Sequence, residues 1–113
     1  MDEYVRLNHK LSKLYKGISG RGPKYLKTYA VENILVVKIN WYPEKIFDGF
    51  NTDDGQLIIK KTYKHIFNRW GEKSREIIEE IMKLKVTEFY FDENMALSKN
   101  EKIIIFLLDK KIG

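Results

Sequence analysis

The 113-residue chain contains no cysteine. This absence excludes disulfides, thiolate metal ligands and a cysteine nucleophile, and it fits a reducing compartment such as the cytoplasm. Histidine is scarce as well, and neither His9 nor His65 has a second histidine or a carboxylate four positions further along the chain. Because paired ligands on one helix face need that spacing, we expect no metal site and no cofactor.

Long hydrophobic runs are also missing. The longest apolar run, Ile103 to Leu108, has six residues, whereas a membrane-spanning helix needs about 20. The first residues do not combine a basic segment with an apolar run, so we expect no signal peptide. The sequence therefore predicts one soluble, cytoplasmic domain over residues 1–113.

Patterns that carry catalysis are absent too. No serine lies in a nucleophile-elbow pattern, and the adjacent carboxylates Glu79 and Glu80 point to different helix faces. The acidic segment Asp48–Gly55 resembles a calcium loop, but Phe50 fills a position that needs an oxygen ligand. We therefore expect a protein that binds and does not catalyse a reaction.

What the chain does have is segregated positive charge. Its net charge is +5, from 21 basic and 16 acidic residues. Seven cations and no acid occur between Arg6 and Lys27, and six cations with one acid occur between Lys60 and Arg75. Such segregation attracts anionic partners, although lysines that only solvate helix faces would produce the same pattern.

Periodicity predicts the first three elements. Apolar residues recur every three or four positions from Tyr4 to Ile18, which indicates an amphipathic helix that Gly17 or Gly20 ends. Two β-branched and aromatic runs follow and predict a hairpin. These runs are Tyr25–Val31 and Ile34–Asn40.

The second half repeats this order of elements. After a short helical turn within Glu44 to Phe50, a long helix is expected from Asp54 to Lys83, with Asp53 as its cap and Gly71 marking a kink. Two more strands are expected at Val86 to Phe91 and Ile103 to Leu108, on either side of a polar loop from Asp92 to Asn100.

The resulting order, α-β-β-α-β-β, predicts a two-layer α+β domain with both helices on one face of an antiparallel four-stranded sheet. Because every residue from Ile103 to Leu108 is apolar, we expect both faces of that strand to be buried. A homodimer through the open sheet face, or through an edge strand, would supply the missing cover.

The segment Gly20-Arg21-Gly22-Pro23-Lys24 joins the first helix to the hairpin. Gly17 and Gly22 have phosphate-loop spacing, but Pro23 occupies the lysine position, which excludes nucleotide hydrolysis. A simpler anion site stays open, in which the amides of Gly20, Arg21 and Gly22 form a nest beside the charges of Arg21 and Lys24. The alternative is a stiff connector without a ligand.

A second possible use of these cations is nucleic-acid binding. Lys27 alternates with Tyr25 and Tyr29 on one side of the first strand, an arrangement that can stack bases and track phosphates. The basic first helix, the Gly20–Lys24 loop and the lysines of the long helix (Lys60, Lys61 and Lys64) would complete that surface.

Several of these features together resemble the MpsC-like family. They are the Gly20–Lys24 loop before a hairpin, the Pro43–Glu44 turn before the Asp53–Gly55 helix start, the Val86 strand that ends at Asp92, and the closing strand Glu101–Phe106. The family is named after a component of a putative Na+-translocating, membrane-potential-generating system. The resemblance implies an accessory role beside a membrane transport complex, without catalytic residues or a cofactor.

Two functions therefore stay open. The first is a dimeric, non-catalytic accessory or regulatory protein, in which Gly20, Arg21, Gly22, Lys24 and Lys27 contact an anionic ligand or partner. The second is a nucleic-acid-binding module that uses the same basic surface.

Overall fold

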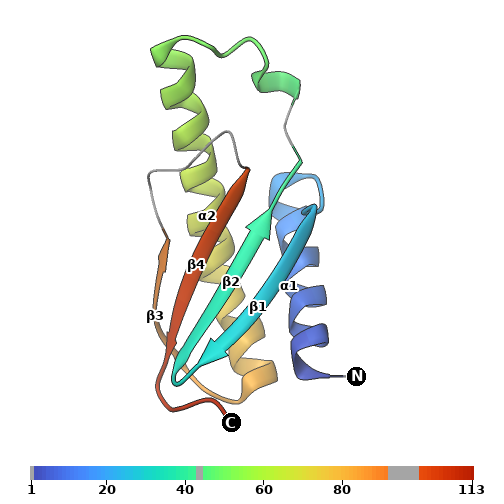
Figure 1. Cartoon of the computed structure of the whole chain (residues 1–113), viewed down its shortest axis with the longest axis vertical. Coiled ribbons are helices and arrows are strands. Elements are labelled where there is room, and N and C mark those ends of the chain that lie inside the picture. The colour runs from blue at the N-terminus through green and yellow to red at the C-terminus, as the bar shows by residue number, and fades with distance from the viewer. Residues whose placement is uncertain (1, 43–44, 92–99) are drawn as a thin grey trace.

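The structure is a computed structural model that describes residues 2–42, 45–91 and 100–113. Two helices and four strands follow one another in the predicted α-β-β-α-β-β order (Figure 1). The elements are α1 (Glu3–Ser19), β1 (Tyr25–Val31), β2 (Ile34–Asn40), the short 3-10 helix η1 (Lys45–Phe47), α2 (Asp53–Met82), β3 (Val86–Phe91) and β4 (Glu101–Leu108). The Pro43–Glu44 turn and nearly all of the expected Asp92–Asn100 loop lie outside the described residues.

The four strands form one antiparallel sheet in the order β1-β2-β4-β3. The last strand, β4, therefore lies between β2 and β3, and β1 and β3 are the two edges. Directly paired residues share a face of the sheet, so Tyr29, Val36, Ile105 and Tyr90 form one row across all four strands.

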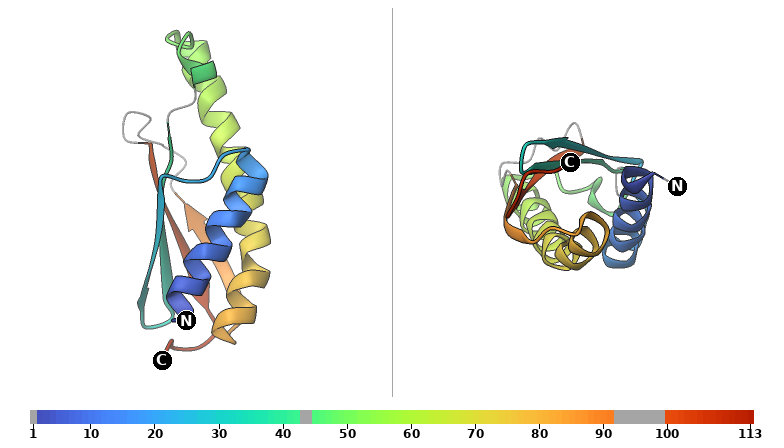
Figure 2. Two further views of the ribbon diagram at one scale, coloured as in Figure 1. Left: turned by 90° about the vertical axis from the view of Figure 1, so that its right-hand side faces the viewer. Right: turned by 90° about the horizontal axis from the view of Figure 1, so that it is seen from below.

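Both helices cover the same face of this sheet, which gives the predicted two-layer α+β architecture (Figure 2). The core lies between the two layers, and its largest fully buried side chains are Trp70, Phe67 and Phe106. Trp70 also donates a hydrogen bond from Nε1 to the backbone oxygen of Leu11 at 3.1 Å, which ties α2 to α1.

Helix α1 follows the predicted stripe, since Leu7 and Leu11 are fully buried. Asp2 caps its start by accepting a hydrogen bond from the Tyr4 N–H. Of the two glycines considered as its end, Gly20 is the C-cap, with a left-handed φ of 88°. Gly17 lies inside the helix, one turn before that end.

Helix α2 begins differently from the prediction. Its N-cap is Thr52, whose Oγ1 accepts the Gly55 N–H at 3.1 Å, and Asp53 is the first helical residue. Gln56 does not complete a capping box, because its side-chain amide donates to the Phe50 oxygen at 2.8 Å. The prediction of Asp53 as the cap was therefore wrong by one residue.

Gly71 lies within α2, which is assigned as one unbroken helix. The residue is buried, and a Cβ added there would overlap the Phe89 ring of β3. Close packing of a strand side chain against the helix backbone accounts for the glycine, and the kink stays a prediction.

Strand β4 alternates between its two faces although all its residues from Ile103 on are apolar. Ile104 points toward the helices and is fully buried, whereas the preceding residue, Ile103, is 48% exposed. The expectation that both faces are buried is therefore wrong for the single chain, because among the described residues no element lies over the outer face of the sheet (Figure 2).

Candidate functional site

The Gly20–Lys24 loop uses much of its own hydrogen-bonding capacity. The Gly20 N–H donates to the Lys16 oxygen at 2.8 Å as part of the helix cap. The Ser19 hydroxyl bonds the Tyr15 and Arg21 oxygens at 2.8 Å each and accepts a longer bond, 3.4 Å, from the Arg21 N–H. Two of the three amides proposed as an anion nest thus already have acceptors within the chain.

The three cations predicted to bind an anion at this loop contact different parts of the structure. The Arg21 guanidinium lies 4.3 Å from the centroid of the Tyr42 ring, a cation–π contact at the end of β2. Lys24 joins the sheet through its backbone N–H, which donates to the Asn40 oxygen at 2.7 Å. Lys27 lies on the outer face of the sheet, with Nζ 5.9 Å from the Tyr25 ring centroid. Anion binding by these residues stays a prediction.

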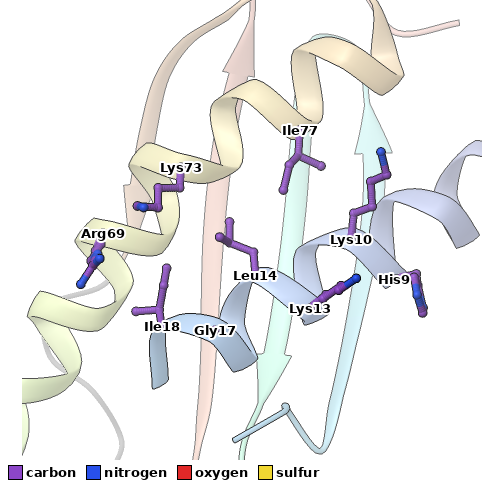
Figure 3. A pocket seen from close by; sticks show the side chains of 9 residues that line it. All are labelled: His9, Lys10, Lys13, Leu14, Gly17, Ile18, Arg69, Lys73 and Ile77. Atoms are coloured by element: carbon purple, nitrogen blue, oxygen red, sulfur yellow. The ribbon is translucent and has the colours of Figure 1, made fainter. Parts of the chain in front are cut away.

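A groove between α1 and α2 brings other cations together (Figure 3). Its volume is about 590 Å³. The lining residues are His9, Lys10, Lys13, Leu14, Gly17 and Ile18 from α1, and Arg69, Lys73 and Ile77 from α2. The groove thus combines the two basic stretches that the sequence showed separately.

The floor of this groove is apolar. Leu14 and Ile18 extend from α1 toward α2, and Ile77 extends from α2 toward α1 (Figure 3). All three are half-buried and pack against the core. Leu14 and Ile18 belong to the apolar stripe predicted from Tyr4 to Ile18, so this stripe contacts both the core and the groove.

The rim of the groove is positively charged. Lys10 Nζ lies 3.9 Å from a Glu80 carboxylate oxygen, an ion pair between the two helices at one end. Within the part of the chain that the structure describes, no carboxylate lies within ion-pair distance of Lys13, Arg69 or Lys73. The sequence shows each cation, but only the packing of α1 on α2 places all of them around one groove.

A second, smaller cavity of about 350 Å³ lies between α1 and the Gly20–Lys24 loop. It shares His9 and Lys13 with the larger groove, and Gly22 and Pro23 form its other wall. The loop therefore borders a basic surface of α1, although Arg21, Lys24 and Lys27 do not line either cavity.

The outer face of the sheet is the other distinctive surface. Tyr29 and Tyr90, at the two ends of one cross-strand row, are 51% and 54% exposed. At one end of the face, Lys38 Nζ lies 3.5 Å from Glu101 Oε2, which also accepts a bond from the Tyr25 hydroxyl at 3.1 Å. The negative charge of the Glu101 carboxylate is the main cause that raises the pKa of Lys38.

One buried cation was not anticipated from the sequence. Lys102 lies on the inner face of β4 with 5% exposure, and its Nζ lies 5.1 Å and 5.9 Å from the ring centroids of Phe91 and Phe67. Strand alternation was the available signal, since Lys102 shares the face of Ile104 and Phe106.

Two further searches concern the described residues only. Across residues 2–42, 45–91 and 100–113, no three histidine or carboxylate side chains come together as a possible metal-binding group. In the same ranges, no helix is both long and apolar enough to span a membrane.

Comparison with known proteins identifies the family of this chain. No curated protein and no solved structure matches this chain. A family model described as "Na+-translocating membrane potential-generating system (MpsC)" matches residues 5–110, nearly the whole chain. The chain therefore belongs to the MpsC family, as the resemblance of its loop, hairpin and closing strand predicted.

Proposed function

We propose that this protein is a non-catalytic, cytoplasmic accessory or regulatory component of a membrane ion-transport system that generates a Na+-dependent membrane potential. The observation that carries the proposal is the family match over residues 5–110, whose description names such a system. The protein would act by binding, because its sequence contains none of the nucleophile, metal or nucleotide patterns that catalysis requires.

We further propose that the protein acts as a homodimer formed through the outer face of its sheet. That face carries a row of large apolar side chains across four strands, from Tyr29 through Val36 and Ile105 to Tyr90. Exposed apolar surface of this kind is characteristic of interaction sites. A two-fold axis over the row would place each copy's apolar residues against those of the other copy.

The accessory role can be tested in cells that make the protein. Deleting its gene should lower the membrane potential, read with a potential-sensitive dye, in Na+ medium and leave it unchanged when K+ replaces Na+. Re-expression of the chain should restore the potential. Purified protein alone in liposomes should generate no potential, because an accessory component does not itself move the ion.

An unchanged Na+-dependent potential in the deletion strain would contradict the proposal. The nucleic-acid alternative predicts a different result: binding of the purified chain to single-stranded DNA or RNA that weakens steeply as salt rises, with a slope set by the number of phosphates contacted.

A further inference from the structure

We propose that the groove between α1 and α2 binds an amphiphilic anion, a molecule with a phosphate or carboxylate head on an aliphatic chain. The assignment rests on the groove alone, so it holds or fails independently of the accessory role. Two halves of the groove match the two halves of such a ligand.

The floor matches the aliphatic chain. Leu14, Ile18 and Ile77 leave apolar surface half-exposed between the helices, and a bound hydrocarbon would remove that surface from water. The volume of about 590 Å³ lies within the usual range of roughly 300–1,000 Å³ for small-molecule sites.

The rim matches the anionic head. Arg69 and Lys73 are four residues apart on α2, and Lys10 and Lys13 are three apart on α1, so each helix carries adjacent like charges on this side. Such pairs destabilise a helix. An anion bound beside Arg69 and Lys73 would relieve the repulsion on α2 and form charge-assisted hydrogen bonds.

Gly17 supplies an independent observation. Apart from proline, glycine is the residue with the lowest helix propensity. Gly17 nevertheless lies inside α1, and not at its cap. A Cβ added there would meet no atom within 4 Å, so packing against the rest of the chain does not require glycine. Gly17 lines the groove, and its missing side chain keeps that space open for a ligand.

The residues that line the groove also favour an amphiphilic anion over a nucleic acid as its ligand. Single-strand binding sites stack bases on aromatic rings along a basic track. Here the imidazole of His9 is the one ring among the lining residues that the structure describes. The Glu80 carboxylate, paired with Lys10, sets an acid at one end of the groove. A single head group fits this arrangement better than a continuous polyanion.

Calorimetric titration of the full chain tests the proposal by dividing the ligand into its parts. Decyl phosphate, below its critical micelle concentration, should bind with a 1:1 stoichiometry per chain. Inorganic phosphate, which has only the head, and decanol, which has only the tail, should each bind at least tenfold more weakly. Equal affinity for decyl phosphate and either part would overturn the proposal.

Three variants locate the site. The double variant Arg69→Ala/Lys73→Ala should lose at least tenfold in affinity for decyl phosphate, and Gly17→Leu should lose as much by filling the groove while its helical circular dichroism is retained. Lys61→Ala, an exposed cation on α2 outside the groove, is the matched control and should bind like the wild type. Wild-type affinity in folded Gly17→Leu would overturn the assignment.

Two more titrants identify the source of the ligand. Co-sedimentation with vesicles of phosphatidylglycerol and phosphatidylcholine (1:3), lost in Gly17→Leu, indicates a lipid taken from a bilayer. Binding of decyl phosphate without co-sedimentation indicates a free amphiphile, and either result supports the ligand class. Tighter binding of a single-stranded oligonucleotide that Gly17→Leu abolishes would overturn it in favour of nucleic acid.

Discussion

At the scale of single residues, two helical glycines have opposite surroundings. Gly71 faces the Phe89 ring across the core, and any side chain there would overlap it. Gly17 borders open space at the surface. The sequence shows the same residue type in two helices, and only the contacts of each position reveal that one glycine permits packing while the other leaves a groove empty.

Gly71→Ala should destabilise the protein by about 1–3 kcal/mol, because the added methyl overpacks the interface between α2 and β3. Gly17→Ala should instead stabilise it by up to about 1 kcal/mol, since alanine has the higher helix propensity and meets no neighbour. Urea unfolding followed by circular dichroism compares the two variants. A Gly71→Ala variant as stable as the wild type would show that Phe89 is not packed against the helix.

The Lys38–Glu101 pair makes a pH prediction. The pKa of Lys38 is raised in the folded protein by the Glu101 carboxylate, so folding is favoured while the lysine is protonated. This contribution is complete below the pKa of an unfolded lysine and is lost as pH rises through the higher folded value, above about pH 10. It is small because both side chains are partly exposed to solvent.

NMR titration of the lysine Cε resonances measures this directly. In Glu101→Gln the pKa of Lys38 should fall toward the ordinary lysine value. An unchanged Lys38 titration in Glu101→Gln would show that the pair does not form in solution.

At the scale of elements, the ends of the two long helices are set by local capping. Gly20 ends α1 in a left-handed conformation that glycine adopts without strain. Thr52 begins α2 by accepting the Gly55 N–H. Both residues were visible in the sequence, but Thr52, Asp53 and Asp54 are all acceptable caps, so propensity could not choose among them.

The assignment of the cap can be tested with two substitutions. Thr52→Ala should cost about 1 kcal/mol of unfolding free energy, because it leaves an amide of the first turn without its acceptor. Asp53→Asn keeps the size of the side chain and removes only its favourable charge near the helix dipole, so its cost should be smaller, about 0.3–1 kcal/mol. Chemical denaturation of both variants gives the order, and a Thr52→Ala variant as stable as the wild type would contradict Thr52 as the cap.

At the scale of the whole molecule, the helices cover one face of the sheet, and no other element of the described ranges lies over the opposite face (Figure 2). The helices bury the inner residues of β4, such as Ile104. An outer residue such as Ile103 is exposed in the single chain and can be buried only by contact with another molecule. This surface is the structural basis for the proposed dimer.

If the outer face forms a dimer, light scattering after size-exclusion chromatography should give twice the chain mass of 13.5 kDa at micromolar concentration. Ile103→Glu should then give the monomer mass and a melting temperature that no longer rises with protein concentration. Leu57→Glu is the control, since Leu57 is equally exposed but lies on α2, away from the sheet face. A monomeric wild-type protein would contradict the dimer.

The sequence by itself determined the order and type of the elements, because periodicity, capping residues and turn residues act over a few neighbouring positions. Tertiary structure decided the rest. It set the sheet order that places β4 in the centre, the exposure of Ile103, and the convergence of Lys13 with Arg69 and Lys73 on one groove. These features depend on which distant segments pack together. Because the free energy of that packing is spread over the whole core, a local sequence pattern cannot predict it.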